Sequence, residues 1–389
     1  MPTQPATLEA NEGRGAIGPD SSTMRAARLH RKGDALRVDV VPRPRLRAGD
    51  VLVNVKACGI VPNVANVLNY GDDFLVRQPP LPAIFGLDAA GVVVETGEVV
   101  HGVEVGDRVY VNPQRSCGAC DFCRMGQPAA CEYLTLNGYF GIGAKSEQTF
   151  QNYPFGGYAE YMTAPQVSLV KLPSSVSFET AARWGYLGTA YGALRLGRVD
   201  MNTTVLVNGA SGTLGLGAVL FALALGAPKI LGVGRNVELL ERVRAIAPDR
   251  IEVHSTTAGR SVAEWARSQT NGRGADVVID ALPPFTPVAA FEQGLQALAR
   301  MGRHVNCGGV VDTISFNVAE IMLKGQSLIG STWFTTAQGQ EMANLAGSGQ
   351  VKLDLLEHRV FSLENINEGL AEIERRDGGF SNIVVSPSL

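Results

Sequence analysis

The stretch VLVNGASGTLGLGAVLFALALG, residues 205–226, decides the fold of the second half of the chain. An apolar run typical of a buried strand leads into a glycine-rich turn, which opens a helix of small and apolar residues. Glycines let the backbone approach a pyrophosphate, and the helix N-terminus offers free N–H groups. The strand–turn–helix setting favours a dinucleotide site over a plain glycine turn. The expected cofactor contacts are Gly209, Ser211, Gly212, Thr213, Leu214 and Gly215.

Strands and helices alternate beyond this turn, which predicts a doubly wound parallel sheet. Expected strands cover residues 229–234, 251–254, 275–280 and 304–308, and expected helices cover 236–246, 262–270 and 287–300. The second strand ends in GVGRN, where a site for NAD usually has a carboxylate for the ribose 2′-OH. Here Gly234, Arg235 and Asn236 stand instead, which favours NADP(H) over NAD(H), because a guanidinium pairs with a 2′-phosphate. A solvated arginine at a strand end is the alternative.

The first half of the chain has a different pattern of predicted secondary structure. Residues 1–23 are polar and aperiodic, which predicts a disordered tail. From Met24 onward, short strand-like runs separated by turns predict a β-rich domain. Residues 177–197 are expected to form a helix, with Ser177 near its start. We therefore expect domains over 24–186 and 187–330, with mixed elements in 331–389.

Four cysteines interrupt the β-rich domain, at Cys117, Cys120, Cys123 and Cys131, with the spacing C-x2-C-x2-C-x7-C. Four thiolates saturate a tetrahedral zinc ion, so such an ion would be structural and would leave no open position for a substrate. Two disulfides and an iron–sulfur cluster are the alternatives. The start of the chain has no apolar signal-peptide core, and a cytoplasmic location disfavours disulfides.

The composition excludes two classes of partner. The chain has 389 residues and a formal net charge of −3, and it lacks a basic block, so nucleic acid is not expected. The longest apolar run, of about 11 residues, is too short to span a bilayer. We expect a cytoplasmic protein that acts on a small molecule.

Together these segments resemble the medium-chain dehydrogenase/reductase superfamily, in its zinc-containing alcohol dehydrogenase branch. The resemblance rests on VLVNVKACGI, GDRVYVNP, the four-cysteine lobe, GGYAEY, TAYGAL, the nucleotide turn and HRVFSLENINEGL. It implies a GroES-like catalytic domain plus a Rossmann domain, with the last segment completing the first domain. It also implies that the four cysteines bind one structural Zn²⁺, and that the protein is a homodimer or homotetramer.

Members of this branch usually carry a second, catalytic zinc, and its ligand positions differ here. The Cys expected after the G-I pair is Val61, the His of G-H-E is Leu87, and the Cys or Asp before TAYGAL is Gly185. The usual proton-relay hydroxyl position holds Asn63. Without these ligands a dication in an apolar site is strongly disfavoured. A relocated metal that uses Asp88 and a second carboxylate is the alternative.

Loss of this zinc would change the accessible chemistry, because zinc stabilises the alkoxide of an alcohol. Hydride addition to an enone, quinone, iminium ion or activated carbonyl needs only hydrogen-bond donors or a general acid. We therefore predict an NADPH-dependent reductase with the candidate catalytic residues Asn63, Asp88, Tyr186 and Tyr191. Asp88 as a buried structural carboxylate, and Trp184 and Trp333 as core residues and not stacking platforms, are the plainer interpretations. An alcohol dehydrogenase with a side-chain acid–base and a cofactor-binding protein without turnover remain alternatives.

Overall fold

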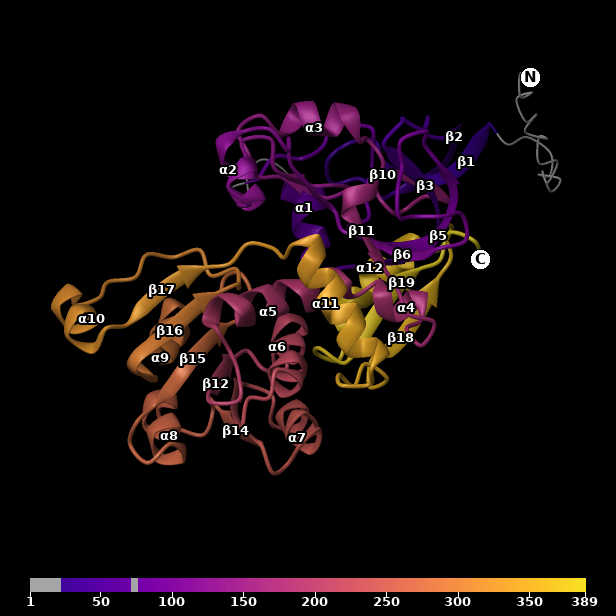
Figure 1. Cartoon of the computed structure of the whole chain (residues 1–389). Coiled ribbons are helices and arrows are strands. Elements are labelled where there is room, and N and C mark those ends of the chain that lie inside the picture. Colours follow the sequence, from indigo (N-terminus) through magenta and orange to yellow (C-terminus); the bar gives the residue numbers. More distant parts are fainter. Residues whose placement is uncertain (1–21, 71–75) are drawn as a thin grey trace, which may run out of the picture.

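The computed structural model describes residues 22–70 and 76–389, which form a β-rich unit and an α/β unit (Figure 1). The predicted disordered tail therefore lies almost entirely outside the described residues. The predicted boundary between residues 186 and 187 falls inside a helix, α5 (Trp184–Gly197), which leads from one unit into the other.

The α/β unit is built on a six-stranded parallel sheet with the order β14-β13-β12-β15-β16-β17. Its strands are β12 (Thr204–Asn208), β13 (Lys229–Gly234), β14 (Ile251–Ser255), β15 (Ala275–Asp280), β16 (Leu298–Asn306) and β17 (Ser327–Gly330). Successive strands are added on one side of β12 up to β14 and then, from β15 onward, on its other side. Because the strand order reverses between β12 and β15, a crevice is expected at the carboxyl ends of these two strands. The expected doubly wound sheet is confirmed.

Helices cover both faces of this sheet (Figure 1). On one face lie α5, α6 (Thr213–Ala224) and α7 (Val237–Ala245); on the other lie α8 (Val262–Gln269) and α9 (Val288–Gln296). The side chains of alternate strand residues point to opposite faces of the sheet. Val205 and Val207 pack with α5 and α6, while Leu206 packs with α8, so both sides of the strand are buried.

Three regions differ from expectation. The helix expected over 287–300 ends at Gln296, and Leu298 starts β16, because a backbone ladder to β15 pairs it with Ala275. The helix expected over 177–197 is split into α4 (Phe178–Ala181) and α5, although Ser177 caps it as predicted by accepting from the Thr180 N–H. Finally, α10 (Val318–Lys324) and β17 were not predicted, since their short apolar runs lack a clear period.

The β-rich unit has a main sheet of order β11-β6-β5-β3-β19-β18, with β10 also paired to β3. Its strands are β3 (Asp50–Gly59), β5 (Asp88–Thr96), β6 (Arg108–Val111), β10 (Tyr161–Pro165), β11 (Leu169–Lys171), β18 (Glu357–Phe361) and β19 (Ser381–Val385). The end of the chain thus returns to the first unit, because β19 pairs with β3 through Val385 and Cys58.

Smaller elements complete this unit. A second sheet has the order β2-β1-β4, and a third, in the cysteine lobe, has the order β7-β8-β9. These strands are β1 (Thr23–Leu29), β2 (Arg37–Pro42), β4 (Ala83–Ile84), β7 (Gln114–Arg115), β8 (Thr135–Leu136) and β9 (Phe140–Gly141). The helices are α1 (Val64–Tyr70), α2 (Asp121–Arg124), α3 (Ser146–Asn152), α11 (Thr336–Gly347) and α12 (Ile366–Glu372). None of the described helices is long and apolar enough to cross a membrane.

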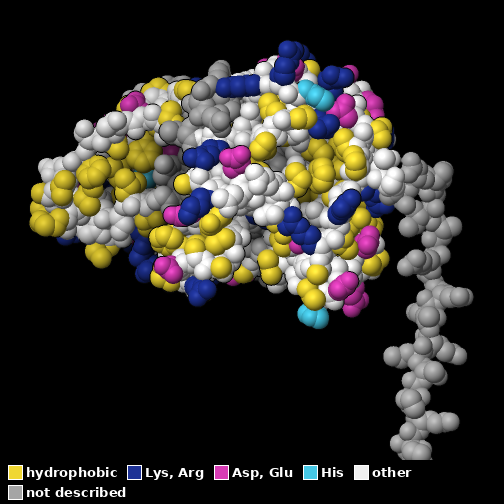
Figure 2. Space-filling view, turned by 90° about the horizontal axis from the view of Figure 1, so that it is seen from above, with side chains coloured by type: hydrophobic (Ala, Val, Ile, Leu, Met, Phe, Trp, Pro, Cys, Tyr) yellow, Lys and Arg dark blue, Asp and Glu magenta, His cyan; other side chains and the backbone are white. Residues whose placement is uncertain are grey.

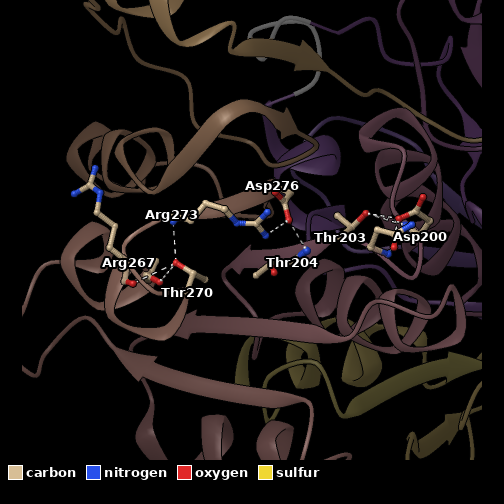
Figure 3. A network of polar contacts seen from close by, with 10 residues as sticks. Asp200, Thr203, Thr204, Arg267, Thr270, Arg273 and Asp276 are labelled. Carbon is tan, nitrogen blue, oxygen red and sulfur yellow. Dashed lines mark hydrogen bonds and ion pairs between the residues drawn. The ribbon is translucent and has the colours of Figure 1, made fainter.

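A polar network ties the amino ends of the two central strands together (Figure 3). The Asp276 carboxylate accepts from the Thr204 N–H at 2.9 Å and from Arg273 at 2.9 Å, so it joins β15 to β12. Asp200 accepts in turn from the Thr203 hydroxyl at 2.8 Å. This network lies at the end of the sheet opposite the crevice.

Candidate active site

The glycine turn has the geometry that a dinucleotide requires. Gly209 has φ +91°, in the left-handed region. A Cβ on Gly215 would lie 2.0 Å from the Gly209 carbonyl oxygen, so only glycine allows α6 to pack this close to β12. Gly212 is the N-cap of α6, and the buried Thr213 hydroxyl beside it has no hydrogen-bond partner. This orphaned hydroxyl and the free N–H groups of the first helical turn fit a cofactor phosphate.

The end of β13 places the predicted ribose contacts beside this turn. A Cβ on Gly234 would lie 3.2 Å from the Ser211 hydroxyl oxygen. Arg235 is exposed, and Ser255 donates to its carbonyl at 3.1 Å. The Asn236 side chain caps α7 by accepting from the Leu239 N–H at 3.0 Å, so its oxygen already has a structural partner. A 2′-phosphate accepts hydrogen bonds, so the exposed Arg235 guanidinium and the Asn236 Nδ2 group are both suitable donors at this strand end.

The four cysteines converge as predicted. Their Sγ atoms all lie within 4.8 Å of one another. Cys117 Sγ is 3.6 Å from Cys131 Sγ and 4.0 Å from Cys123 Sγ, close to the ~3.8 Å expected around a tetrahedral zinc with Zn–S bonds of about 2.3 Å. All four are free thiols in this structure. The backbone N–H groups of Ala119 and Cys120 point at Cys117 Sγ and lower its pKa to about 6, whereas burial raises the pKa of Cys131 to about 12.

The three positions expected for catalytic zinc ligands lie in the core of the first unit or at the start of α5. Val61 and Leu87 are buried and apolar. A Cβ on Gly185 would lie 2.1 Å from Asp88 Oδ1, so the Asp88 carboxylate occupies the space that a side chain at residue 185 would need. Within residues 22–70 and 76–389, the cysteine quartet is the one group of three or more His, Cys, Asp or Glu residues arranged to hold a metal ion.

Asp88 is a buried titratable group beside Gly185. It is the first residue of β5 and is completely buried. Its Oδ1 accepts from the Tyr110 hydroxyl at 2.9 Å, whereas Oδ2 has no hydrogen-bond partner. Burial raises the pKa of Asp88 to about 7, against the opposing effects of Tyr110, the Arg183 charge and the Gly185 backbone. This carboxyl is therefore able to carry a proton near neutral pH.

Asn63 and Tyr186 lie in the same region as Asp88. Burial raises the pKa of Tyr186 to about 12, with a further rise from Asp88 and a lowering by the Asn63 backbone. Tyr186 is thus a neutral donor. Asn63 Oδ1 accepts from Asn66 Nδ2 at 2.7 Å, which leaves the Asn63 Nδ2 group to donate elsewhere. The structure therefore brings together three of the four predicted catalytic residues.

Tyr191 does not join them. It points to the opposite side of α5, where its hydroxyl donates to Glu341 Oε2 on α11 at 2.7 Å. Burial, followed by the Glu341 carboxylate, raises its pKa. The spacing agrees with this, because five residues on an α-helix turn the side chain by about 140°, so residues 186 and 191 face different neighbours. The tryptophans are packing residues: Trp184 is buried and donates to the Gly339 carbonyl, and Trp333 donates to Asn112.

Two polar residues of this region were missed by the sequence analysis. Tyr139 is buried, and burial together with Tyr186 and Tyr158 raises the pKa of its hydroxyl well above 10, against a lowering by a hydrogen bond with the Asn63 side chain. Arg183 is buried and donates to the carbonyls of Ser381 at 3.0 Å and Gly379 at 2.9 Å, which anchors the returning segment beside Asp88. An arginine within the apolar run AARWGY was the one available signal for Arg183; no signal marked Tyr139.

A dinucleotide turn in a parallel sheet, joined to a β-rich unit with a thiolate metal site, defines a nucleotide-dependent oxidoreductase. Residues 47–174 match the alcohol dehydrogenase GroES-like domain, and residues 213–348 match the zinc-binding dehydrogenases. The chain belongs to the zinc-type alcohol dehydrogenase family of the medium-chain dehydrogenase/reductase superfamily.

Individual relatives agree with this assignment. An alcohol dehydrogenase of Geobacillus stearothermophilus is 32% identical over 347 residues, which cover 89% of this chain and 94% of the relative. A NAD-dependent alcohol dehydrogenase of Sulfolobus acidocaldarius is 29% identical over 357 residues, covering 90% and 96%. Among solved structures, AibC has a TM-score of 0.80 at 28% identity and covers 96% of this chain and 99% of its own.

Proposed function

We propose that this protein uses NADPH to reduce an activated C=C bond, such as an enone, or a quinone, iminium ion or activated carbonyl, without a catalytic metal ion. The observation that carries the proposal is the place of Asp88. Its carboxylate fills the space beside Gly185 where the family's third zinc ligand would stand, while Val61 and Leu87 offer no ligand atom. A proton donor thus stands where relatives of this branch are expected to hold a Lewis acid.

The residues of this region suit a reduction. When bound, NADPH supplies a hydride. With an enone, quinone or carbonyl, negative charge then develops on the substrate oxygen, and the nearby donors are Asn63 Nδ2, the Tyr139 hydroxyl and the Tyr186 hydroxyl. The Asp88 carboxyl holds the proton that completes the addition, since its pKa of about 7 leaves a large protonated fraction near neutral pH. The orphaned Oδ2 atom is the natural site of that proton.

Arg235 supports the preference for NADPH over NADH. It stands exposed at the end of β13, beside the turn that fits the pyrophosphate, and no carboxylate occupies the position where one would repel a 2′-phosphate. The Sulfolobus relative is named as NAD-dependent, so the proposed preference for NADPH rests on the residues of this chain alone.

The second candidate is an alcohol or aldehyde dehydrogenase in which Asp88 acts as a base. The names of the alcohol dehydrogenase relatives favour it. It requires an ionised Asp88, so its rate would rise with pH through about 7, whereas the rate of the reduction would fall.

The test is NADPH consumption with a panel of enones, quinones, iminium ions and aldehydes, beside NADP⁺ reduction with alcohols, using protein whose zinc content is measured. The proposal expects turnover in the first direction at one zinc per chain. Faster alcohol oxidation would support the second candidate. NADPH binding without turnover for any acceptor would indicate a cofactor-binding protein, and a second tightly bound zinc required for activity would overturn the metal-free mechanism.

We also propose that the protein is a homo-oligomer that uses the free edge of its parallel sheet. β17 forms this edge, and α10 beside it exposes large apolar side chains, which Figure 2 shows gathered at this end of the molecule. The exposed residues are Phe316, Val318, Met322, Leu323 and Leu328. Two such patches related by a two-fold axis would bury on the order of 1,000 Å², the minimum for a specific interface.

This interface is tested by sedimentation. The double variant M322E/L328K should shift the protein toward the monomer, while V167E, on an exposed valine far from the patch, should leave the mass unchanged. A monomeric wild-type protein at micromolar concentration would refute the proposal.

A further inference from the structure

A second buried polar cluster lies at the carboxyl end of the parallel sheet. It consists of Asn208, the last residue of β12, Asp280, the last residue of β15, and His304 of β16. Asn208 Nδ2 donates to Asp280 Oδ2 at 3.0 Å, and His304 Nε2 lies 3.9 Å from the same oxygen. Asp280 and His304 are completely buried. None of these residues belongs to the proposed chemistry.

The cluster demands a carboxylate at residue 280. Asn208 Nδ2 also donates to the Ala290 carbonyl at 2.9 Å, so its two hydrogens are both directed at acceptors. Asp280 Oδ1 accepts from the Leu282 N–H at 3.3 Å. Both side-chain atoms of residue 280 must therefore accept hydrogen bonds. A carboxylate has two acceptor oxygens, whereas an amide has one acceptor and one donor. Burial raises the pKa of Asp280 to about 7, and burial lowers that of His304 to about 4, so the histidine is neutral.

Through these bonds Asp280 controls the segment that follows β15, residues 281–284. This segment borders the nucleotide turn: a Cβ on Gly209 would lie 3.0 Å from the Ala281 carbonyl oxygen. On its other side, the Gly309 N–H donates to the Leu282 carbonyl at 2.8 Å. The Asp280 carbonyl in turn accepts from the Cys307 N–H at 3.0 Å. The Asp280 side chain thus ties the end of β12 to the segment after β15, and its main-chain carbonyl bonds the segment after β16, where the crevice opens.

We propose that Asp280 is a positioning residue that holds segment 281–284 in the shape that receives the nicotinamide half of the cofactor. In a doubly wound sheet the first three strands bind the adenosine half of a dinucleotide, and the strands beyond the switch point bind the nicotinamide half. The switch point here lies between β12 and β15. This inference rests on the proposed use of NADPH.

Binding of cofactor fragments tests it. Dissociation constants for NADPH and for adenosine 2′,5′-bisphosphate, which lacks the nicotinamide half, are measured by calorimetry at about pH 8, where Asp280 is ionised. In Asp280→Asn, which keeps the side-chain volume, NADPH binding should weaken roughly tenfold or more, because the new amide opposes Asn208 and misplaces the segment. Binding of the bisphosphate should change less than about twofold.

The matched control is Asp276→Asn. Asp276 is on the same strand and also bonds β12, but at the opposite end of the sheet (Figure 3). It should lower the unfolding temperature and leave both dissociation constants unchanged. Equal weakening of both ligands in Asp280→Asn, or no weakening of either, would overturn the positioning role. If the variant fails to fold, Leu282→Gly, which loosens the same segment and keeps the backbone N–H that bonds Asp280, must show the same selective loss. A wild-type protein that binds the bisphosphate fragment but not NADPH, or neither, would instead refute the proposed cofactor.

Discussion

The substitution Asp88→Asn should make the protein less active and, at alkaline pH, more stable. Burial raises the pKa of Asp88 from 3.8 to about 7. Because the folded state holds the proton more tightly than the unfolded chain, this carboxyl contributes stability at low pH, and the contribution is lost as pH rises through about 7. At about 1.4 kcal/mol for each pKa unit, the ionised carboxylate costs the folded protein about 4 kcal/mol above pH 7.

Asparagine resembles the protonated carboxyl and does not titrate. The free energy of unfolding of the variant, minus that of the wild type, should therefore rise by roughly 2.5 kcal/mol between about pH 5 and about pH 8. Because the variant-minus-wild-type difference is compared between two pH values, any cost of placing an amide beside Tyr110 that does not depend on pH cancels. Urea unfolding at a series of pH values measures it. The same variant should lose on the order of 10²- to 10⁴-fold in kcat, because it removes the proton donor.

Asp50→Asn is the matched control. Asp50 is also a buried aspartate that accepts from a tyrosine hydroxyl, that of Tyr153 at 3.1 Å, but it lies at the far end of β3. It should leave kcat and its pH profile unchanged. The reasoning about Asp88 would be refuted by a stability difference that does not vary with pH. It would equally be refuted by a wild-type kcat for reduction that does not fall as pH rises through about 7, or by a variant that keeps full activity.

Three further outcomes are expected. Metal analysis should find about one zinc per chain, and Cys117→Ser should lower stability before it alters kcat; loss of turnover in a fully folded variant would contradict a structural metal. Arg235→Asp should weaken NADPH binding by roughly 1–3 kcal/mol and NADH binding much less. Equal effects on the binding of the two cofactors would mean that Arg235 faces away from the ribose. Tyr139→Phe should lower kcat about tenfold or more and cost at most about 1.5 kcal/mol of stability, the usual contribution of one hydrogen bond; an unchanged kcat would remove Tyr139 from the site.

Local patterns were the part of this protein that sequence reasoning predicted well. The glycine turn and the cysteine quartet each lie within a short segment, so their spacing reflects their geometry directly. Helix ends were harder: α9 stops at Gln296 because the next residues pair with a neighbouring strand, a long-range interaction that overrides helical propensity. The role of Tyr191 was also hard to predict from the sequence, because its hydrogen-bond partner Glu341 lies on a helix far along the chain.

The sequence by itself determined the scaffold: a glycine turn after a strand, a cysteine quartet, and the residues Val61, Leu87 and Gly185 at the positions where we expect catalytic ligands in this family. Only the tertiary structure decided what lies beside Gly185. Asp88 and Gly185 are far apart in the chain, yet the carboxylate of one fills the space that a side chain of the other would need. It also decided that Tyr139 joins this region and that Asp280 links three loops. Such contacts depend on how strands and helices pack, and neither spacing nor periodicity along the chain encodes which side chains meet across that packing.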